Sequence, residues 1–395
     1  GDVYKRQLFS IGSLLCALSS TLTMLVGARV IQGLGGALML PVGRLVVLRA
    51  YPRSELVRIM GFITIPGLLG PLLGPTMGGW MVQYLTWHWI FLINLPVGMV
   101  GCYAVWKLIP DLRGSERTRF DSVGFVLFGA AMVLITIAME GLGELHLPHL
   151  RVMLLLFGGL ACLAAYWLRA GHIDNPLFSP VLFKTRTFAV GILGNLFARL
   201  GSGALPFLVP LLLQVALGYS PSEAGMSMLP LAAAAMFAKS IARPLIERLG
   251  YRIVLTGNTL ALGIMLASMG LVSEHTPYPL LLCMLAVLGA INSLQFTAMN
   301  TVTLIDLDDA QASSGNSLLS VVAQLSLSLG VACAGALLGG FTAEAGNDGV
   351  ESVLGAFQLT FLTVGIMAML AAAIFLQLSP KDGKRVVSRE HDLEH

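Results

Sequence analysis

Apolar residues occur in long runs along the chain, and each run is close to the length that a helix needs to cross a bilayer. A helix rises about 1.5 Å per residue, so about 20 apolar residues span the hydrocarbon core. Charged residues gather in the short segments between the runs. The pattern predicts about twelve spanning helices, at residues 8–26, 28–49, 58–82, 89–109, 121–142, 150–169, 187–216, 222–243, 252–272, 278–300, 313–340 and 352–378.

The overall composition agrees with this pattern. Hydrophobic residues make up 56% of the 395 residues and charged residues only 11%, whereas soluble domains carry about 25% charged residues. A soluble fold is therefore excluded. The sequence predicts an all-α, polytopic membrane protein with the lipid bilayer as its surroundings.

The placement of charge predicts an orientation. If residue 8 lies on the cytoplasmic side, the loops that fall inside carry most of the Lys and Arg residues, as at 110–119 and 381–389. The loops that fall outside carry acids instead, among them Glu144, Glu274 and Glu344. This is the positive-inside asymmetry. It predicts a multi-pass protein of the bacterial inner membrane with a cytoplasmic C-terminus.

The predicted spans fall into groups. The longest connection, near 171–186, contains Pro176 and Pro180, and it separates six earlier spans from six later ones. Residues 1–7 are polar and lack an initiator Met, so we interpret them as a non-native scar. The expected division is 1–7, an N-terminal bundle at 8–110, two central linker helices at 111–170, a cytoplasmic connection at 171–186, a C-terminal six-helix bundle at 187–380 and a tail at 381–395.

One predicted span is unusually rich in glycine and proline. Gly70, Gly74 and Gly78 recur at a spacing of four, which leaves a bare stripe that another helix can approach at backbone distance. Pro71 and Pro75 repeat the same spacing and should bend the helix. A bent helix with a bare surface is typical of a membrane protein whose halves move against each other.

Several charged side chains lie inside predicted spans, where they are costly. Arg29 lies close to Gln32 and should face the interior, or else it snorkels to the nearby interface. Glu140 is either a proton or cation site or an acid at the outer interface. Arg199 is in mid-span, so we expect it to face inward, either as a substrate contact or as part of a buried polar network.

Amide side chains punctuate the later spans and can line a polar cavity or bond across helices. The candidates for a substrate cavity, together with Arg199, are Asn195, Gln295, Asn316 and Gln324.

Four motifs resemble those of a known family. Leu25, Arg29, Gln32, Gly33, Gly35 and Ala37 resemble the fourth-helix signature of the major facilitator superfamily. The segment from Gly70 to Gly79, with Gly74, Pro75 and Gly78 between them, resembles its fifth-helix antiporter signature without a mismatch. The run 87–98 is similar to the sixth-helix entry of the fourteen-helix drug:proton antiporter branch, with His88 in place of the usual Arg. Glu247, Arg248, Gly250 and Arg252 resemble the cytoplasmic loop signature.

The resemblance implies a bundle of two pseudo-symmetric halves with two extra helices between them, and proton-coupled export of drugs or amphiphilic molecules. On this alignment residue 8 begins the third helix, so about twelve of fourteen helices are expected. The first-helix acid that often pairs with the Arg29-type residue is then missing. Two alternatives stay open: an exporter of a defined, possibly anionic metabolite, which Arg199 would suit, and a truncated fragment that does not transport.

Other chemistry is not indicated by the sequence. There is no Gly-x-x-x-x-Gly-Lys-Ser/Thr phosphate loop, no helical metal-ligand pair and no nucleophile–base–acid set. Basic residues are not clustered with aromatic ones, which disfavours nucleic-acid binding. We expect no enzyme activity, no cofactor and no metal. The expected partners are a small-molecule substrate, protons and lipid, and the protein is predicted to be monomeric.

Overall fold

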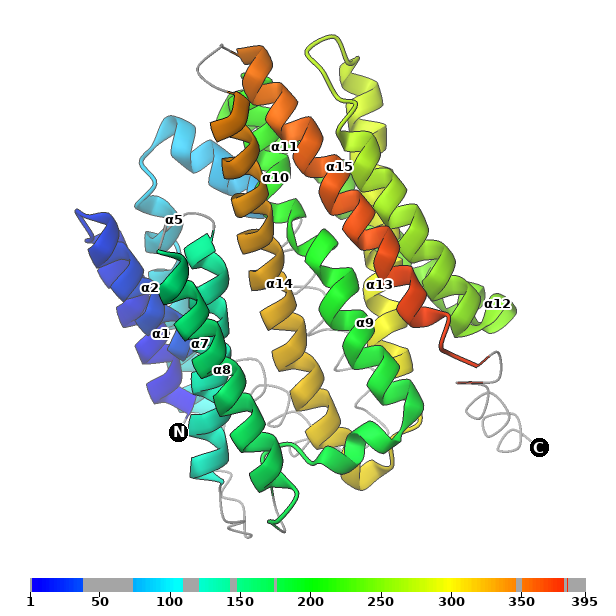
Figure 1. Cartoon of the computed structure of the whole chain (residues 1–395). Coiled ribbons are helices and arrows are strands. Elements are labelled where there is room, and N and C mark those ends of the chain that lie inside the picture. Colours follow the sequence, from blue (N-terminus) through cyan, green and yellow to red (C-terminus); the bar gives the residue numbers. More distant parts are fainter. Residues whose placement is uncertain are drawn as a thin grey trace. The chain divides into compact units, whose positions relative to one another are not determined.

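The computed structural model describes residues 2–37, 74–108, 121–142, 148–173, 176–345, 350–379 and 382 (Figure 1). Within these ranges the chain is helical and contains no β-strand. The all-helical prediction is therefore confirmed for the described residues. The helices fall into two compact units, which are taken in turn.

The first unit combines helices from the beginning of the chain with one short helix from its second half. Its elements are α1 (Asp2–Ala17), α2 (Leu22–Ala37), a helical stretch at 74–84, α5 (Trp89–Leu92), α6 (Asn94–Leu108) and α11 (Pro221–Ser227). Glycine lets α1 and α2 meet at backbone distance. A Cβ added at Gly12 would lie 2.5 Å from Cα of Gln32, and one added at Gly35 would collide with the backbone nitrogen of Phe9.

The second unit contains the long helices that follow (Figure 1). They are α7 (Ser122–Leu142), α8 (His149–Ala170), the 3-10 turn η1 (Pro180–Lys184), α9 (Arg186–Gly203), α10 (Leu205–Leu211), the π-helical turn η2 (Leu212–Ala216), α12 (Leu229–Met269), α13 (Tyr278–Leu304), α14 (Asp309–Ala345) and α15 (Val350–Phe375).

The core of the second unit surrounds α9. In the apolar segment Arg186–Ala216, 61% of the residues are buried, against 17% in the windows within α7 and α8. One buried cluster joins α8, α9 and α14 through Tyr166, Phe188 and Leu318. A second joins α9, α12, α13 and α15, with Met299 and Phe375 among its members. The span that carries Arg199 is thus central in its unit, and α7 and α8 are peripheral.

Seven segments of the described residues are long and apolar enough to cross a membrane, judged by length and composition. Six of them correspond to single predicted spans or to parts of them. The seventh, Pro221–Met269, contains the predicted span 222–243 and most of the predicted span 252–272. The predicted spans 28–49 and 58–82 lie largely outside the described residues.

Two interruptions shape these helices. α9 ends at Gly203, and Pro206 and Pro210 follow; proline has no N–H to donate to the preceding turn. The backbone widens directly afterwards, where the N–H of Leu217 donates to the carbonyl of Leu212 at 3.0 Å. Within α12, Gly250 has φ 79° and ψ 160°, a conformation that glycine adopts without the Cβ clash. It interrupts the helical backbone in the basic segment between the two predicted spans.

Candidate functional site

A buried polar cluster of the second unit surrounds Arg199, which lies in the last third of α9 and near the middle of the apolar segment Arg186–Ala216. Its side chain is only 3% exposed. The Nε donates to Oδ1 of Asn195 at 2.9 Å, and Nη2 donates to Oδ1 of Asn300 on α13 at 3.3 Å. The guanidinium carbon also lies 4.3 Å from the centroid of the Phe296 ring. Asn195 is held in turn because its Nδ2 donates to the carbonyl of Gly191 at 2.9 Å.

This arrangement leaves Arg199 with spare binding capacity. Among the described residues no carboxylate forms an ion pair with it. A guanidinium has five N–H donors, and two hydrogen bonds to described acceptors are present, so three donors remain for other groups. This buried cation is stabilised only by amide oxygens and an aromatic ring, so an anionic group would bind favourably next to it. The sequence alternatives of substrate contact and structural network both fit this geometry.

Of the predicted cavity residues, the structure brings Asn195 together with Arg199. Gln295 has a different environment: it is 1% exposed, its Oε1 accepts from Asn258 at 2.8 Å and its Nε2 donates to Thr259 at 2.7 Å. These bonds tie α12 to α13. Asn316 and Gln324 are exposed on α14, and among the described residues no hydrogen bond joins either side chain to the Arg199 cluster.

In the first unit, Arg29 and Gln32 form one network with α1. Arg29 Nη1 donates to Oε1 of Gln32 at 2.8 Å, and Gln32 Nε2 donates to Oγ of Ser13 at 2.7 Å. The guanidinium of Arg29 lies 5.6 Å from the centroid of the Phe91 ring. Gln32 is buried, whereas Arg29 is exposed. Arg29 is therefore held by an amide and a ring. Its exposure differs from the expected interior position and agrees with the alternative that it lies at an interface.

The glycine-rich segment packs against α11. A Cβ added at Gly79 would collide with the carbonyl oxygen of Pro221, and one added at Gly225 would lie 2.5 Å from the carbonyl oxygen of Pro75. Thr76 Oγ1 donates to the carbonyl of Gly225 at 3.2 Å. The two helices thus approach through glycine on both sides.

The structure describes only part of the predicted stripe of Gly70, Gly74 and Gly78. Gly70 lies outside the described residues, and no described atom lies within 4 Å of a Cβ built at Gly74 or Gly78. The close approach uses Gly79, which is on an adjacent face of the same helix. The periodicity in the sequence pointed to the stripe, but the position of α11 decides which glycine is in contact.

The remaining predicted residues lie apart from these clusters. Glu247 accepts from Nε of Arg243 at 2.7 Å on the surface of α12, one turn from Gly250. Arg248 is exposed and Arg252 is half-buried. The backbone of Glu140 belongs to α7, but its side chain lies outside the described part of the chain. No cluster of three or more His, Cys, Asp or Glu side chains was found in the part of the chain that the structure describes.

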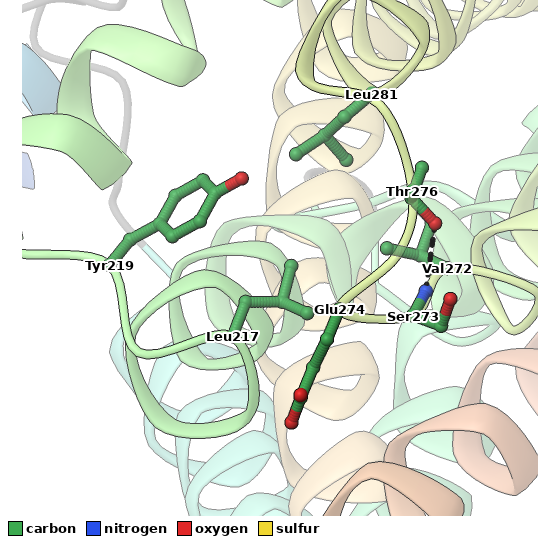
Figure 2. A pocket seen from close by; sticks show the side chains of 7 residues that line it. All are labelled: Leu217, Tyr219, Val272, Ser273, Glu274, Thr276 and Leu281. Atoms are coloured by element: carbon green, nitrogen blue, oxygen red, sulfur yellow. Dashed lines mark hydrogen bonds between the residues drawn. The ribbon is translucent and has the colours of Figure 1, made fainter.

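A shallow cavity lies at one end of the second unit, beside the turn that joins α12 to α13 (Figure 2). Its volume is about 150 Å³. It is lined by Leu217, Tyr219, Val272, Ser273, Glu274, Thr276 and Leu281. Sequence reasoning did not predict it, since its walls come from segments more than 50 residues apart.

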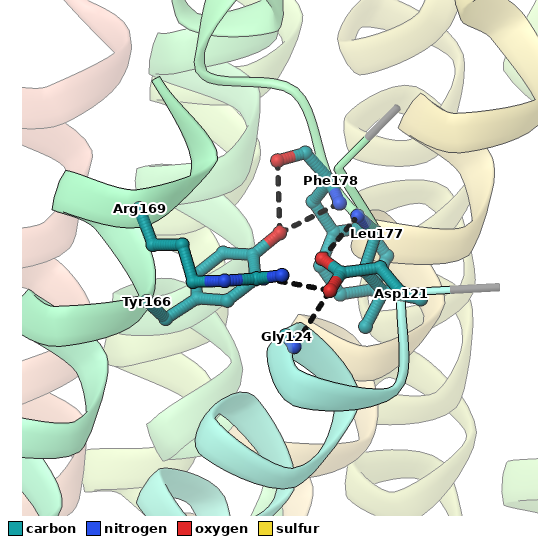
Figure 3. Close-up of polar contacts among 6 residues, drawn as sticks. All are labelled: Asp121, Gly124, Tyr166, Arg169, Leu177 and Phe178. Carbon is teal, nitrogen blue, oxygen red and sulfur yellow. Dashed lines mark hydrogen bonds and ion pairs between the residues drawn. The ribbon is translucent and has the colours of Figure 1, made fainter. Parts of the chain in front are cut away.

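A polar cluster that sequence reasoning also missed joins α7, α8 and the connection that follows (Figure 3). Asp121 accepts from Nη1 of Arg169 at 2.6 Å and from the N–H of Gly124 at 2.8 Å. Tyr166 donates to the carbonyl of Phe178 at 2.9 Å and accepts its N–H at 2.7 Å. An aspartate directly before an apolar run is an N-cap signal, which was the available clue to Asp121.

These features define a class of protein. Long apolar helices, a cation buried in mid-span and glycine-mediated helix contacts are those of a polytopic α-helical membrane protein. The sequence matches the model of the Major Facilitator Superfamily over residues 7–330 and again over 191–394. The chain belongs to the Major Facilitator Superfamily, a family of membrane transporters.

Similar proteins agree with this assignment. The chain is 45% identical over 375 residues to the "Putative multidrug resistance protein MdtD" of Pectobacterium atrosepticum, with 94% of this chain and 80% of that protein covered. It is 45% identical over 386 residues to the protein of the same name in Salmonella heidelberg, with 97% of this chain and 81% of that protein covered. The resemblance and the predicted fold class are confirmed.

Solved structures support the fold. A bacterial homologue of the human lysosomal transporter Spinster, in an inward-facing and unoccupied conformation, matches with a TM-score of 0.63 at 18% identity, covering 95% of this chain and 81% of that one. A POT family transporter in complex with a thioalcohol-conjugated peptide matches with a TM-score of 0.66 at 15% identity, covering 96% and 81%.

Proposed function

We propose that this transporter exports drugs or amphiphilic small molecules from the cytoplasm in exchange for protons. The observation that carries the proposal is the contact between the helical stretch 74–84 and α11, in which Gly79 and Gly225 each face a carbonyl oxygen of the other segment. The relatives named as multidrug resistance proteins support the substrate class.

The glycine contact is suited to reversible closure. Two backbones meet at glycine residues, and two described hydrogen bonds join them: Thr76 donates to the carbonyl of Gly225, and the N–H of Ser222 donates to Oε1 of Gln83 at 3.1 Å. Each such bond contributes only about 0.6 kcal/mol in a membrane protein. Because α11 precedes α12 directly in the chain, a rocking motion of the later helices would make and break this seal.

For proton coupling we propose Arg29 and Gln32 as the polar pair. Arg29 keeps a partner in Gln32, and Gln32 reaches across to Ser13 on α1. This network links α1 and α2 within one unit. A change in the charge surrounding Arg29 would therefore change how these two helices pack. Glu140 is retained as an acid candidate on the basis of sequence.

We further propose the bacterial inner membrane as the location, with a cytoplasmic C-terminus and a monomeric state. The location is supported by the bacterial relatives, and the orientation by the alternation of basic and acidic loops.

The test is an ethidium accumulation assay in bacterial cells that lack their major efflux pumps. Cells expressing the protein should accumulate less ethidium than cells with an empty vector, and a protonophore should abolish the difference. Equal accumulation with and without the protein, for ethidium and for a panel of other amphiphilic dyes, would reject the proposal.

A second candidate function is export of an anionic metabolite, and Arg199 favours it. Three of its five N–H donors lack a described acceptor. If this candidate is correct, a carboxylate or phosphate compound should raise the melting temperature of the purified protein, and Arg199→Gln should remove that rise. A panel of such anions that stabilises wild type and variant equally would rule it out.

A further inference from the structure

We propose that the cavity beside the turn between α12 and α13 is a binding site for a small organic cation, an ammonium group carrying an apolar body of about benzene size. The binding site is inferred from the geometry of the cavity (Figure 2). Only its role as an exit subsite for exported molecules rests on the proposed export function.

The charge of the cavity comes from Glu274. Its side chain is exposed and lines the cavity, and within the described ranges no hydrogen bond or ion pair occupies its carboxylate. The hydroxyl of Tyr219 likewise has no hydrogen-bond partner among the described residues. The centroid of its ring lies 6.2 Å from the centroid of the Tyr278 ring. A carboxylate and an electron-rich ring at one cavity are the groups that bind an ammonium ion.

The rest of the lining combines apolar side chains with the polar residues Ser273 and Thr276, and it is held in place. Val272 and Leu281 are each 1% exposed and anchor the two ends of the turn. The turn is closed because the N–H of Ser273 donates to Oγ1 of Thr276 at 2.9 Å and the N–H of Thr276 donates to the carbonyl of Ser273 at 3.0 Å. A site whose walls are fixed before binding loses little conformational entropy when a ligand enters.

The opposite wall is built by an irregular backbone. The π-helical turn η2 ends at Ala216, and Gly218 follows with φ 69°. This reversal lets the N–H of Tyr219 reach back to the carbonyl of Leu213 at 2.9 Å, which fixes Tyr219 at the cavity beside Leu217. π-helical turns are frequent at functional sites, and here the turn places an aromatic ring at the cavity that Glu274 also lines.

Size and position limit the ligand. A cavity of about 150 Å³ accommodates a molecule of about benzene size. The charge pattern predicts that the loop with Glu274 faces outward. The site is therefore suited to hold the cationic end of an exported amphiphile where it leaves the protein.

The experiment measures binding by saturation-transfer difference NMR, with the full chain in lipid nanodiscs and benzyltrimethylammonium as the probe. Empty nanodiscs correct for partitioning into lipid. Benzyl alcohol and benzoate serve as neutral and anionic probes of the same shape. The wild-type protein should bind the cation more tightly than the alcohol, and benzoate least.

Glu274→Gln should weaken binding of the cation about three- to ten-fold and leave binding of benzyl alcohol unchanged. The matched control is Asp308→Asn, which removes an exposed acid from the turn that follows the other end of α13 and should leave both affinities unchanged. If Glu274→Gln is poorly folded, Tyr219→Leu provides a second test, because loss of the ring should weaken cation binding by a similar factor.

Cation binding that is absent in wild type, or equal in wild type, Glu274→Gln and Tyr219→Leu, overturns the proposal. The ethidium assay is independent of this result. Export with no binding that depends on Glu274 rejects the subsite alone, whereas binding that depends on Glu274 without export rejects the proposed function and leaves the site standing.

Discussion

The guanidinium of Arg199 lies over the ring of Phe296, with 4.3 Å between its central carbon and the ring centroid. The two residues come from α9 and α13 and are almost 100 positions apart in the sequence. Because the cation is buried and has no carboxylate partner among the described residues, the ring and two asparagines supply the stabilisation that an acid would otherwise provide.

A double-mutant cycle on this pair should reveal coupling. Arg199→Met and Phe296→Leu should each lower the free energy of unfolding, and the double variant should lose about 1–2 kcal/mol less than the sum, since the shared contact is lost only once. Unfolding in detergent is the measurement. Arg199→Met with Phe237→Leu, an exposed ring on α12, is the control and should be additive; equal coupling in both cycles would contradict the contact.

Substitution at the glycine contact should impair transport. Gly79→Val and Gly225→Val each place a side chain against a carbonyl oxygen of the facing segment, so either should reduce ethidium export at least about ten-fold while the protein still inserts. Gly257→Val is the control, because no described atom lies within 4 Å of a Cβ built there. Export that survives both Gly79→Val and Gly225→Val would exclude this contact from the transport cycle.

Of the two glutamines that were predicted to line a cavity, Gln295 should contribute more to stability than Gln324. Gln295→Leu removes the partners of Asn258 and Thr259 inside the protein and should cost about 1–2 kcal/mol of stability. Gln324 is exposed, so Gln324→Leu should change the melting temperature little. Equal losses from the two variants would contradict this division.

Asp121 should make stability depend on pH. Burial alone would raise its pKa, but hydrogen bonds from the N–H of Gly124 and from Arg169 outweigh that effect, and the pKa lies below its ordinary value. A carboxylate with a depressed pKa stabilises the folded state above the unfolded value, about 3.9, and this stabilisation is lost as the pH falls through the folded pKa.

The measurement is the melting temperature between pH 7 and pH 3. Asp121→Asn should lower stability at pH 7 by about 2 kcal/mol and flatten the loss of stability at acid pH. Tyr166→Phe removes the neighbouring bonds to Phe178 without touching the carboxylate, so its acid dependence should match that of wild type. If the melting temperature of Asp121→Asn falls with pH as steeply as that of wild type, another group is responsible for the acid dependence.

The sequence predicted the helical class and the polar residues, because both depend on local patterns. Run length and composition suffice to identify spans in lipid, and Arg199 was predicted to face inward because a guanidinium in mid-span is costly elsewhere. Its pairing with Asn195, four residues away on one helix face, was within reach of the same reasoning.

Contacts between distant segments could not be predicted from a single sequence. The spacing of Gly70, Gly74 and Gly78 indicated a bare stripe, yet the close approach to α11 uses Gly79, since the direction from which the partner arrives is a tertiary property. Gln295 was predicted to line a cavity or to bond across helices, and its bonds to α12 correspond to the second alternative. The cavity beside Glu274 depends on a π-helical turn, and the only clue to that turn in the sequence is the pair Pro206 and Pro210.

The most direct test of proton-driven export is transport by the purified protein in proteoliposomes with an imposed pH gradient. We predict that ethidium moves against its concentration gradient toward the acidic side, that collapsing the gradient stops it, and that Gly79→Val abolishes it. Ethidium movement at the same rate with and without the pH gradient, or at the rate of protein-free liposomes, would contradict a proton-coupled exporter.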